Sequence, residues 1–224
     1  MTDTDRADEE PLIVAVDGPA GSGKSTVARA VAAKLGLSYL DTGAMYRSVA
    51  HAALIAGLDG EDPDAVAALA KAVRIEVGER VLVDGEDATQ AIRSPEVTRA
   101  VTVAAANPTV RAEMVRRQRA WVRERGGGVV EGRDIGSVVF PQARLKVFLT
   151  ATPAERERRR AAEAGEAVAS DIARRDEADS TREHSPLTAA EDAITIDTTA
   201  REIDDVVDEI LGLVAQRQLP GKGW

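Results

Sequence analysis

The sequence predicts an α/β fold in which a doubly wound, parallel, five-stranded sheet is flanked by helices. Two observations support it. Short apolar runs alternate with helical patterns from Leu12 to Ile55, as strands and crossover helices do in parallel sheets. The first run leads into Gly18-Pro-Ala-Gly-Ser-Gly-Lys24-Ser25, a glycine-rich phosphate-binding loop in its usual place between a strand and a helix. The fold class is therefore a P-loop architecture, with a small β-containing insertion and a helical lid added.

Each element has its own signal in the chain. Core strands are expected where apolar runs end in turn residues, at 12–16, 37–40, from 129, 145–149 and 193–197. Helices are expected at 27–35, 44–55, 63–72, 95–102, 108–125, 155–163, 168–177 and 203–215. Two short strand-like runs, 74–77 and 81–83, predict a hairpin beside the main sheet. Gly126-Gly-Gly128 is expected to end the helix before the third core strand.

Composition limits the classes of protein to consider. A net charge of −9 argues against nucleic-acid binding, and the absence of cysteine excludes disulfides and thiolate metal sites. With neither a signal-peptide pattern nor a membrane-length apolar run, we expect a cytoplasmic protein without membrane contact. A monomer is expected as well. One domain at 11–219 is expected, with an insertion at 57–102 and a lid at 153–186. An acidic disordered tail at 1–10 and a loose tail at 220–224 complete the chain.

The glycine-rich loop predicts a nucleoside triphosphate ligand. Its backbone N–H groups and the N-terminus of the following helix attract phosphate. Lys24 can reach the terminal phosphates, and the hydroxyl of Ser25 can bind the accompanying Mg²⁺.

Arginines are concentrated in the second half of the chain. Between Arg111 and Arg160 there are 13 Lys and Arg against 6 Asp and Glu, which suggests a small polyanion as partner or, equally, solvated helices. We expect a solvated face for Arg116, Arg117, Arg119, Arg123 and Arg125. At least one of Arg156, Arg158, Arg159 and Arg160 is expected to reach transferring phosphates.

Polar residues follow the predicted strands, where ligands collect in such sheets. Thr42 follows the second strand, and Arg133 with Asp134 follows the third. Asp17 and Glu131 could each hold a water on Mg²⁺ or bond to a nearby loop or helix end. Magnesium ligands and arginine clamps without a nucleophile triad are typical of phosphoryl transfer.

Four motifs in matching order resemble those of bacterial cytidylate kinases: Gly18–Thr26, Leu40-Asp-Thr-Gly-Ala-Met-Tyr-Arg47, Glu131-Gly-Arg-Asp-Ile-Gly136 and Asp179-Ser-Thr-Arg-Glu-His-Ser-Pro-Leu187. The resemblance covers about Leu12 to Leu213. It implies transfer of the γ-phosphoryl group of Mg·ATP to CMP or dCMP under a closing lid.

The resemblance also implies residue roles. ATP would be held by Gly18, Pro19, Ala20, Gly21, Ser22, Gly23, Lys24, Ser25 and Thr26. Thr42 would lie near the acceptor, Arg47, Arg133 and Arg182 would clamp its phosphate, and Arg175 with Asp179 would contact its sugar. Thr102, Arg111 and Asp134 would read the base. Catalysis would then rest on Lys24, Arg133 and Arg182.

The base assignment makes chemical sense. Cytosine offers a 4-amino donor and an N3 acceptor, so a carboxylate beside an arginine complements both, whereas uracil would leave buried groups mispaired. Two alternatives remain. The chain could be a P-loop kinase for another small acceptor, or a GTP-hydrolysing switch protein. The second lacks support because Asn107, the only asparagine, does not begin an N-K-x-D motif.

Overall fold

A computed structural model describes residues 11–58, 62–164 and 187–218. Five strands form one sheet in the order β2-β6-β1-β7-β8, and every pairing between neighbours is parallel. The strands are β1 (Leu12–Asp17), β2 (Tyr39–Asp41), β6 (Gly127–Gly132), β7 (Leu145–Thr150) and β8 (Ile194–Asp197). The predicted fold class, an α/β fold on a parallel five-stranded sheet, is confirmed.

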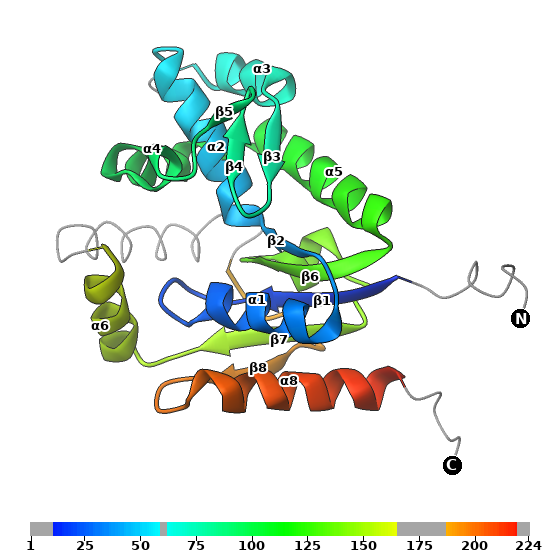
Figure 1. Ribbon diagram of the computed structural model, residues 1–224. Coiled ribbons are helices and arrows are strands. Elements are labelled where there is room, and N and C mark those ends of the chain that lie inside the picture. The colour runs from blue at the N-terminus through cyan, green and yellow to red at the C-terminus, as the bar shows by residue number, and fades with distance from the viewer. Residues whose placement is uncertain (1–10, 59–61, 165–186, 219–224) are drawn as a thin grey trace, which may run out of the picture.

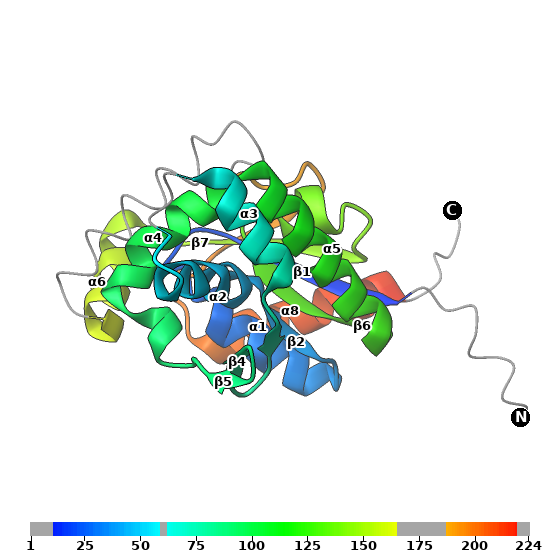
Figure 2. The same ribbon diagram turned by 90° about the horizontal axis from the view of Figure 1, so that it is seen from above.

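Both faces of the sheet are covered, which explains why its central strands are mostly apolar. Val14 and Val16 of β1 pack with α1 (Lys24–Leu35) and α8 (Ile203–Gln218). Ile13 and Ala15 belong to the opposite core, which includes residues of α2 (Thr42–Ile55) and α5 (Pro108–Arg125). Figures 1 and 2 show the two layers on either side of the sheet.

The predicted hairpin is present, with a third strand that the sequence did not predict. β3 (Ile75–Val77), β4 (Val81–Val83) and β5 (Glu86–Asp87) form an antiparallel sheet. It lies between α3 (Pro63–Ala72) and the 3₁₀ turn η1 (Ala91–Arg93), which leads into α4 (Pro95–Ala106). In Figure 1 this group stands above the carboxyl half of the main sheet, beside α2.

Several predicted boundaries are wrong by a few residues, and two of these differences have a clear physical reason. β6 begins at Gly127, not after Gly128, because only Gly126 is needed for the left-handed C-terminal residue of α5. A Cβ on Gly127 would lie 2.7 Å from the carbonyl oxygen of Leu12, so a glycine at this position lets β6 approach β1. α4 runs four residues beyond the predicted end, to Ala106, and Asn107 caps α5 instead.

The prediction that the α5 arginines form a solvated face is wrong for Arg117, whose side chain is only 18% exposed, whereas Arg119 is exposed and also bonds to a neighbouring element. Arg117 donates to the carbonyl oxygens of Ala70, Lys71 and Val73 at the end of α3. Arg119 donates to Val138 and Val139, in the short π-helix η2 (Ile135–Val139). These side chains join elements, because guanidinium donors satisfy carbonyls left free at helix ends.

α6 (Pro153–Ala164) follows β7 and is slightly longer than predicted. The helix predicted at 168–177 falls outside the described residues. No helix in the described ranges is long and apolar enough to cross a bilayer.

Candidate active site at the carboxyl ends of the strands

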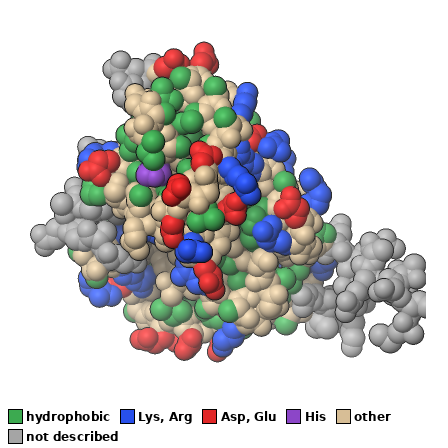
Figure 3. Space-filling model, turned by 45° about the horizontal axis from the view of Figure 1, so that its top comes forward, with side chains coloured by type: hydrophobic (Ala, Val, Ile, Leu, Met, Phe, Trp, Pro, Cys, Tyr) green, Lys and Arg blue, Asp and Glu red, His purple; other side chains and the backbone are tan. Residues whose placement is uncertain are grey.

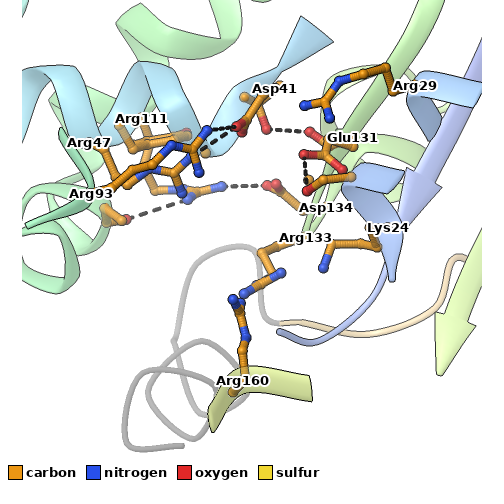
Figure 4. A pocket seen from close by; sticks show the side chains of 16 residues that line it. Lys24, Arg29, Asp41, Arg47, Arg93, Arg111, Glu131, Arg133, Asp134 and Arg160 are labelled. Atoms are coloured by element: carbon orange, nitrogen blue, oxygen red, sulfur yellow. Dashed lines mark hydrogen bonds and ion pairs between the residues drawn. The ribbon is translucent and has the colours of Figure 1, made fainter. Parts of the chain in front are cut away.

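A cavity of about 390 Å³ opens where the phosphate loop, α2, α4, α5 and the end of β6 meet. Of the described residues that line it, seven are cationic and three are acidic: Lys24, Arg29, Arg47, Arg93, Arg111, Arg133 and Arg160, with Asp41, Glu131 and Asp134. Figure 4 shows these side chains pointing inward from several elements. Elsewhere, on the face in Figure 3, acidic and basic groups are interspersed. The cavity therefore concentrates positive charge in a chain of negative net charge.

The phosphate loop has the backbone that the motif predicts. Gly18, Gly21 and Gly23 all have positive φ. A Cβ on Gly18 would lie 2.1 Å from the carbonyl oxygen of Leu149, and one on Gly21 would lie 2.7 Å from that of Arg156. Lys24 donates to the carbonyl oxygen of Pro19 at 2.7 Å and lines the cavity. The loop is therefore shaped by close packing on β7 and α6, which only glycine permits.

The α6 arginines divide into three groups. Arg156 and Arg159 donate to the carbonyl oxygens of Ala20 and Gly21 in the phosphate loop. Arg158 is exposed and paired with Glu155. Arg160 lines the cavity, and its guanidinium lies beside that of Arg133 in Figure 4. Arg160 is thus the member of the four placed to meet a ligand in this cavity.

Glu131, near the end of β6, bonds to side chains of both α1 and β2. Its Oε1 accepts from the Ser25 hydroxyl at 2.8 Å and from the Tyr39 hydroxyl at 2.9 Å. Its backbone carbonyl accepts from Thr42 at 2.6 Å. Burial, and secondarily the charge of Asp41, raises the pKa of the Glu131 carboxyl. Oε2 is buried and has no hydrogen-bond partner among the described residues.

The oxygen ligands that Mg²⁺ prefers are present at this point, in the Ser25 hydroxyl and the Glu131 carboxylate. Of the two acids that the sequence left open, Glu131 fits such a site. Asp17 does not, because its two oxygens accept from the backbone N–H groups of Ile135 and Gly136, each at 2.8 Å. Asp17 therefore bonds to the loop that carries Arg133 and Asp134.

Asp41 organises a second group of cations. It caps α2 by accepting from the backbone of Ala44 at 2.8 Å. Its other oxygen pairs with Arg47 at 2.9 Å and with Arg93 at 3.8 Å. Both arginines line the cavity. The sequence predicted a role for Arg47 but missed Asp41 and Arg93.

Arg111 and Asp134 form a buried ion pair on the cavity wall. The Arg111 guanidinium also lies 5.7 Å from the ring centre of Tyr46. Thr102 is half-buried on α4 and is not among the lining residues, whereas Ala105 of the same helix is. Of the three residues predicted to read the base, the structure therefore brings Arg111 and Asp134 together at the cavity, and Thr102 does not line it.

The remaining predicted residues are placed as follows. Arg133 lines the cavity and donates to the carbonyl oxygen of Gly18 at 2.8 Å. Arg175, Asp179 and Arg182 lie outside the described residues. Arg29, which the sequence gave no reason to select, lies 5.1 Å from the ring centre of Tyr39 and lines the cavity.

Comparison with known proteins identifies similar chains. A family model described as cytidylate kinase matches residues 14–216. The cytidylate kinase of Geobacillus sp. (strain WCH70) is 48% identical over 217 residues, 91% of this chain and 96% of that protein. That of Bacillus subtilis (strain 168) is 46% identical over 222 residues, 93% of this chain and 99% of that protein.

Two further likenesses are of different kinds. A bifunctional pantoate ligase/cytidylate kinase of Parasynechococcus marenigrum is 48% identical over 96% of this chain, which spans 45% of that longer protein. The crystal structure of TT1252 from Thermus thermophilus matches 95% of this chain and all of that one, with a TM-score of 0.52 and 21% identity. The second likeness shows the fold alone.

Proposed function

Because the chain belongs to the cytidylate kinase family, we propose that it transfers the γ-phosphoryl group of ATP to CMP or dCMP, giving CDP or dCDP and ADP. The observation that carries the proposal is that one cavity joins the phosphate loop to the buried Arg111–Asp134 pair. A triphosphate-binding loop and a base-complementary pair within one enclosure are what a nucleoside monophosphate kinase needs.

On the donor side, the loop from Gly18 to Thr26 would bind the ATP phosphates through its backbone N–H groups. Lys24 would exchange its bond to the Pro19 carbonyl for a phosphate oxygen. Mg²⁺, which neutralises phosphate charge when bound, would be held by Ser25 with Glu131 behind it.

On the acceptor side, the cytosine 4-amino group would donate to the Asp134 carboxylate, and Arg111 would donate to the base. Thr42 and Thr102 complete the set that the family resemblance assigns to the nucleoside. Arg175 and Asp179 are assigned to the sugar on the same basis.

Phosphoryl transfer requires the protein to position the two nucleotides and to stabilise the negative charge of the transferring group. Arg47 and Arg133 would align the acceptor phosphate, with Arg182 as a third clamp, and Arg160 lies where it can meet the transferring group. No general base is needed, because the attacking phosphate oxygen is already anionic near neutral pH. We propose a monomeric, cytoplasmic enzyme that uses Mg²⁺.

The test is ADP formation by purified protein with Mg·ATP and CMP, dCMP, UMP, AMP, GMP or no acceptor. Preferential turnover with CMP and dCMP is expected. Equal turnover with and without acceptor would instead indicate a hydrolase or switch, and a preference for another acceptor would indicate a different P-loop kinase.

The base-reading role has its own prediction. In Asp134→Asn, the ratio of kcat/KM for CMP over UMP should fall about tenfold or more, because an amide can turn its donor toward the uracil O4. Thermal unfolding of the variant checks that the loss is not one of folding. An unchanged ratio in a folded variant would remove Asp134 from base recognition.

A further inference from the structure

We propose that Arg93, which follows the antiparallel sheet within the insertion at 57–102, binds the phosphate of the acceptor nucleotide. When the nucleotide enters, Arg93 would leave Asp41 and pair with that phosphate. The inference rests on the proposed function and assigns a substrate-binding role to a residue of the insertion.

The backbone of Arg93 is firmly positioned. Arg93 is the last residue of η1, and the residue before it, Ile92, is completely buried. The following residue, Ser94, caps α4 by accepting from the backbone of Val97 at 3.3 Å. On such a fixed backbone the guanidinium can change partners by side-chain rotation alone, so a new contact does not require the main chain to be ordered.

The side chain is loosely held in comparison with its neighbour. Arg47 is 2.9 Å from Asp41 and 15% exposed, whereas Arg93 is 3.8 Å from the same oxygen and 52% exposed. Half-exposed ion pairs at this distance contribute little stability. Asp41 can therefore release Arg93 at low cost and keep Arg47.

The position suits a phosphate. Arg93 and Arg47 point to the same part of the cavity, on the side opposite Lys24, with Asp41 above them in Figure 4. A single carboxylate carries charge −1 for two arginines, whereas a nucleoside monophosphate brings close to −2 and several acceptor oxygens. The phosphate is the better partner for two guanidinium groups, which prefer forked contacts to its oxygens.

This assignment also gives the insertion a connection to the substrate. η1 packs beside α2 and α4 in the common core through Ile92 and Val97. A contact from Arg93 to the acceptor would make the insertion one wall of the acceptor site.

Equilibrium binding of CMP and of cytidine, without ATP, tests the proposal on the wild type, Arg93→Gln and Arg80→Gln. Arg80 is the matched control, because it lies in the same insertion, pairs with Asp87 at the same 3.8 Å and is 73% exposed. Arg93→Gln should weaken CMP binding about tenfold, the value of one charge-assisted contact, and leave cytidine unchanged. Arg80→Gln should change neither.

Equal CMP binding by Arg93→Gln and wild type would overturn the inference, as would equal weakening of CMP and cytidine. Both of these results leave the kinase proposal standing, provided that wild-type protein phosphorylates CMP. If the wild type binds no CMP, both proposals fail.

Discussion

Asp17 shows how a single buried carboxyl supports the site without facing it. It is 5% exposed, and its oxygens hold the N–H groups of Ile135 and Gly136 at the start of η2. Burial is the largest influence and raises the pKa of Asp17 to about 6, although the two backbone hydrogen bonds lower it. Its ionisation therefore opposes folding at neutral pH.

The pH dependence follows from the sign of that shift. Between about pH 4 and 6 the folded chain keeps a proton on Asp17 that the unfolded chain releases, so the free energy of unfolding falls as pH rises. A shift of about two units corresponds to about 3 kcal/mol. Urea unfolding of wild type and Asp17→Asn from pH 4 to 7 should show this loss only in the wild type.

The wild type and Asp17→Asn both contain Glu131, whose pKa is also raised. Its effect on the free energy of unfolding therefore cancels when the two proteins are compared at the same pH. At pH 4 the variant should be less stable by about 1–3 kcal/mol, since its amide accepts from only one of the two N–H groups. The gap should narrow toward pH 7. Parallel curves would show that Asp17 is not the titrating group.

Site residues could be predicted from the sequence where they lie in or next to a motif, and not elsewhere. The sequence predicts Lys24, Arg47, Arg111 and Asp134 as site residues, and all four line the cavity. Arg93 was missed because its partner Asp41 lies 52 residues earlier, and nothing local indicates such a pairing. The role of Asp17 follows from its burial and its backbone partners, which exist only in the folded chain.

At the scale of elements, two helices were predicted in full, and in both a proline marks the start. α3 and α5 begin and end as predicted, at Pro63–Ala72 and Pro108–Arg125. The start of β6 was not predicted, because the need for a glycine at position 128 comes from contacts that form only in the folded chain. A Cβ there would lie 3.0 Å from the Trp121 ring and 3.1 Å from the Ser38 carbonyl oxygen.

The junction of α3 and α5 gives a prediction with a paired control. Arg117→Met should lower the free energy of unfolding by about 2–3 kcal/mol, because three carbonyls at the end of α3 lose a charged donor. Arg116→Met should change it by about 0.5 kcal/mol or less. Arg116 also pairs with Glu113 but is 67% exposed. Urea unfolding at neutral pH measures both, and equal effects would contradict the capping role.

For the whole molecule, the site is assembled from parts that share no local sequence. The sheet supplies the phosphate loop and the end of β6, α2 and the insertion supply Arg47 and Arg93, and α6 supplies Arg160. Ligands collect at the carboxyl edge of a parallel sheet because its loops and helix N-termini converge there. The sequence predicts that edge. The place of the insertion depends on the side chains it buries against α2, and that of α6 depends on the hydrogen bonds from Arg156 and Arg159 to the phosphate loop.

The contribution of α6 gives the last prediction. Arg160→Gln should lower kcat for CMP phosphorylation more than tenfold with a smaller change in KM, because a cation near the transferring group stabilises charge that is greatest in the transition state. Arg158→Gln should stay within about twofold of wild type, since Arg158 is 71% exposed and pairs only with Glu155 among the contacts described. Steady-state kinetics with varied CMP and ATP separate the two parameters. An Arg160→Gln enzyme with wild-type kcat and a raised KM for CMP would move Arg160 from the transferring phosphate to acceptor binding.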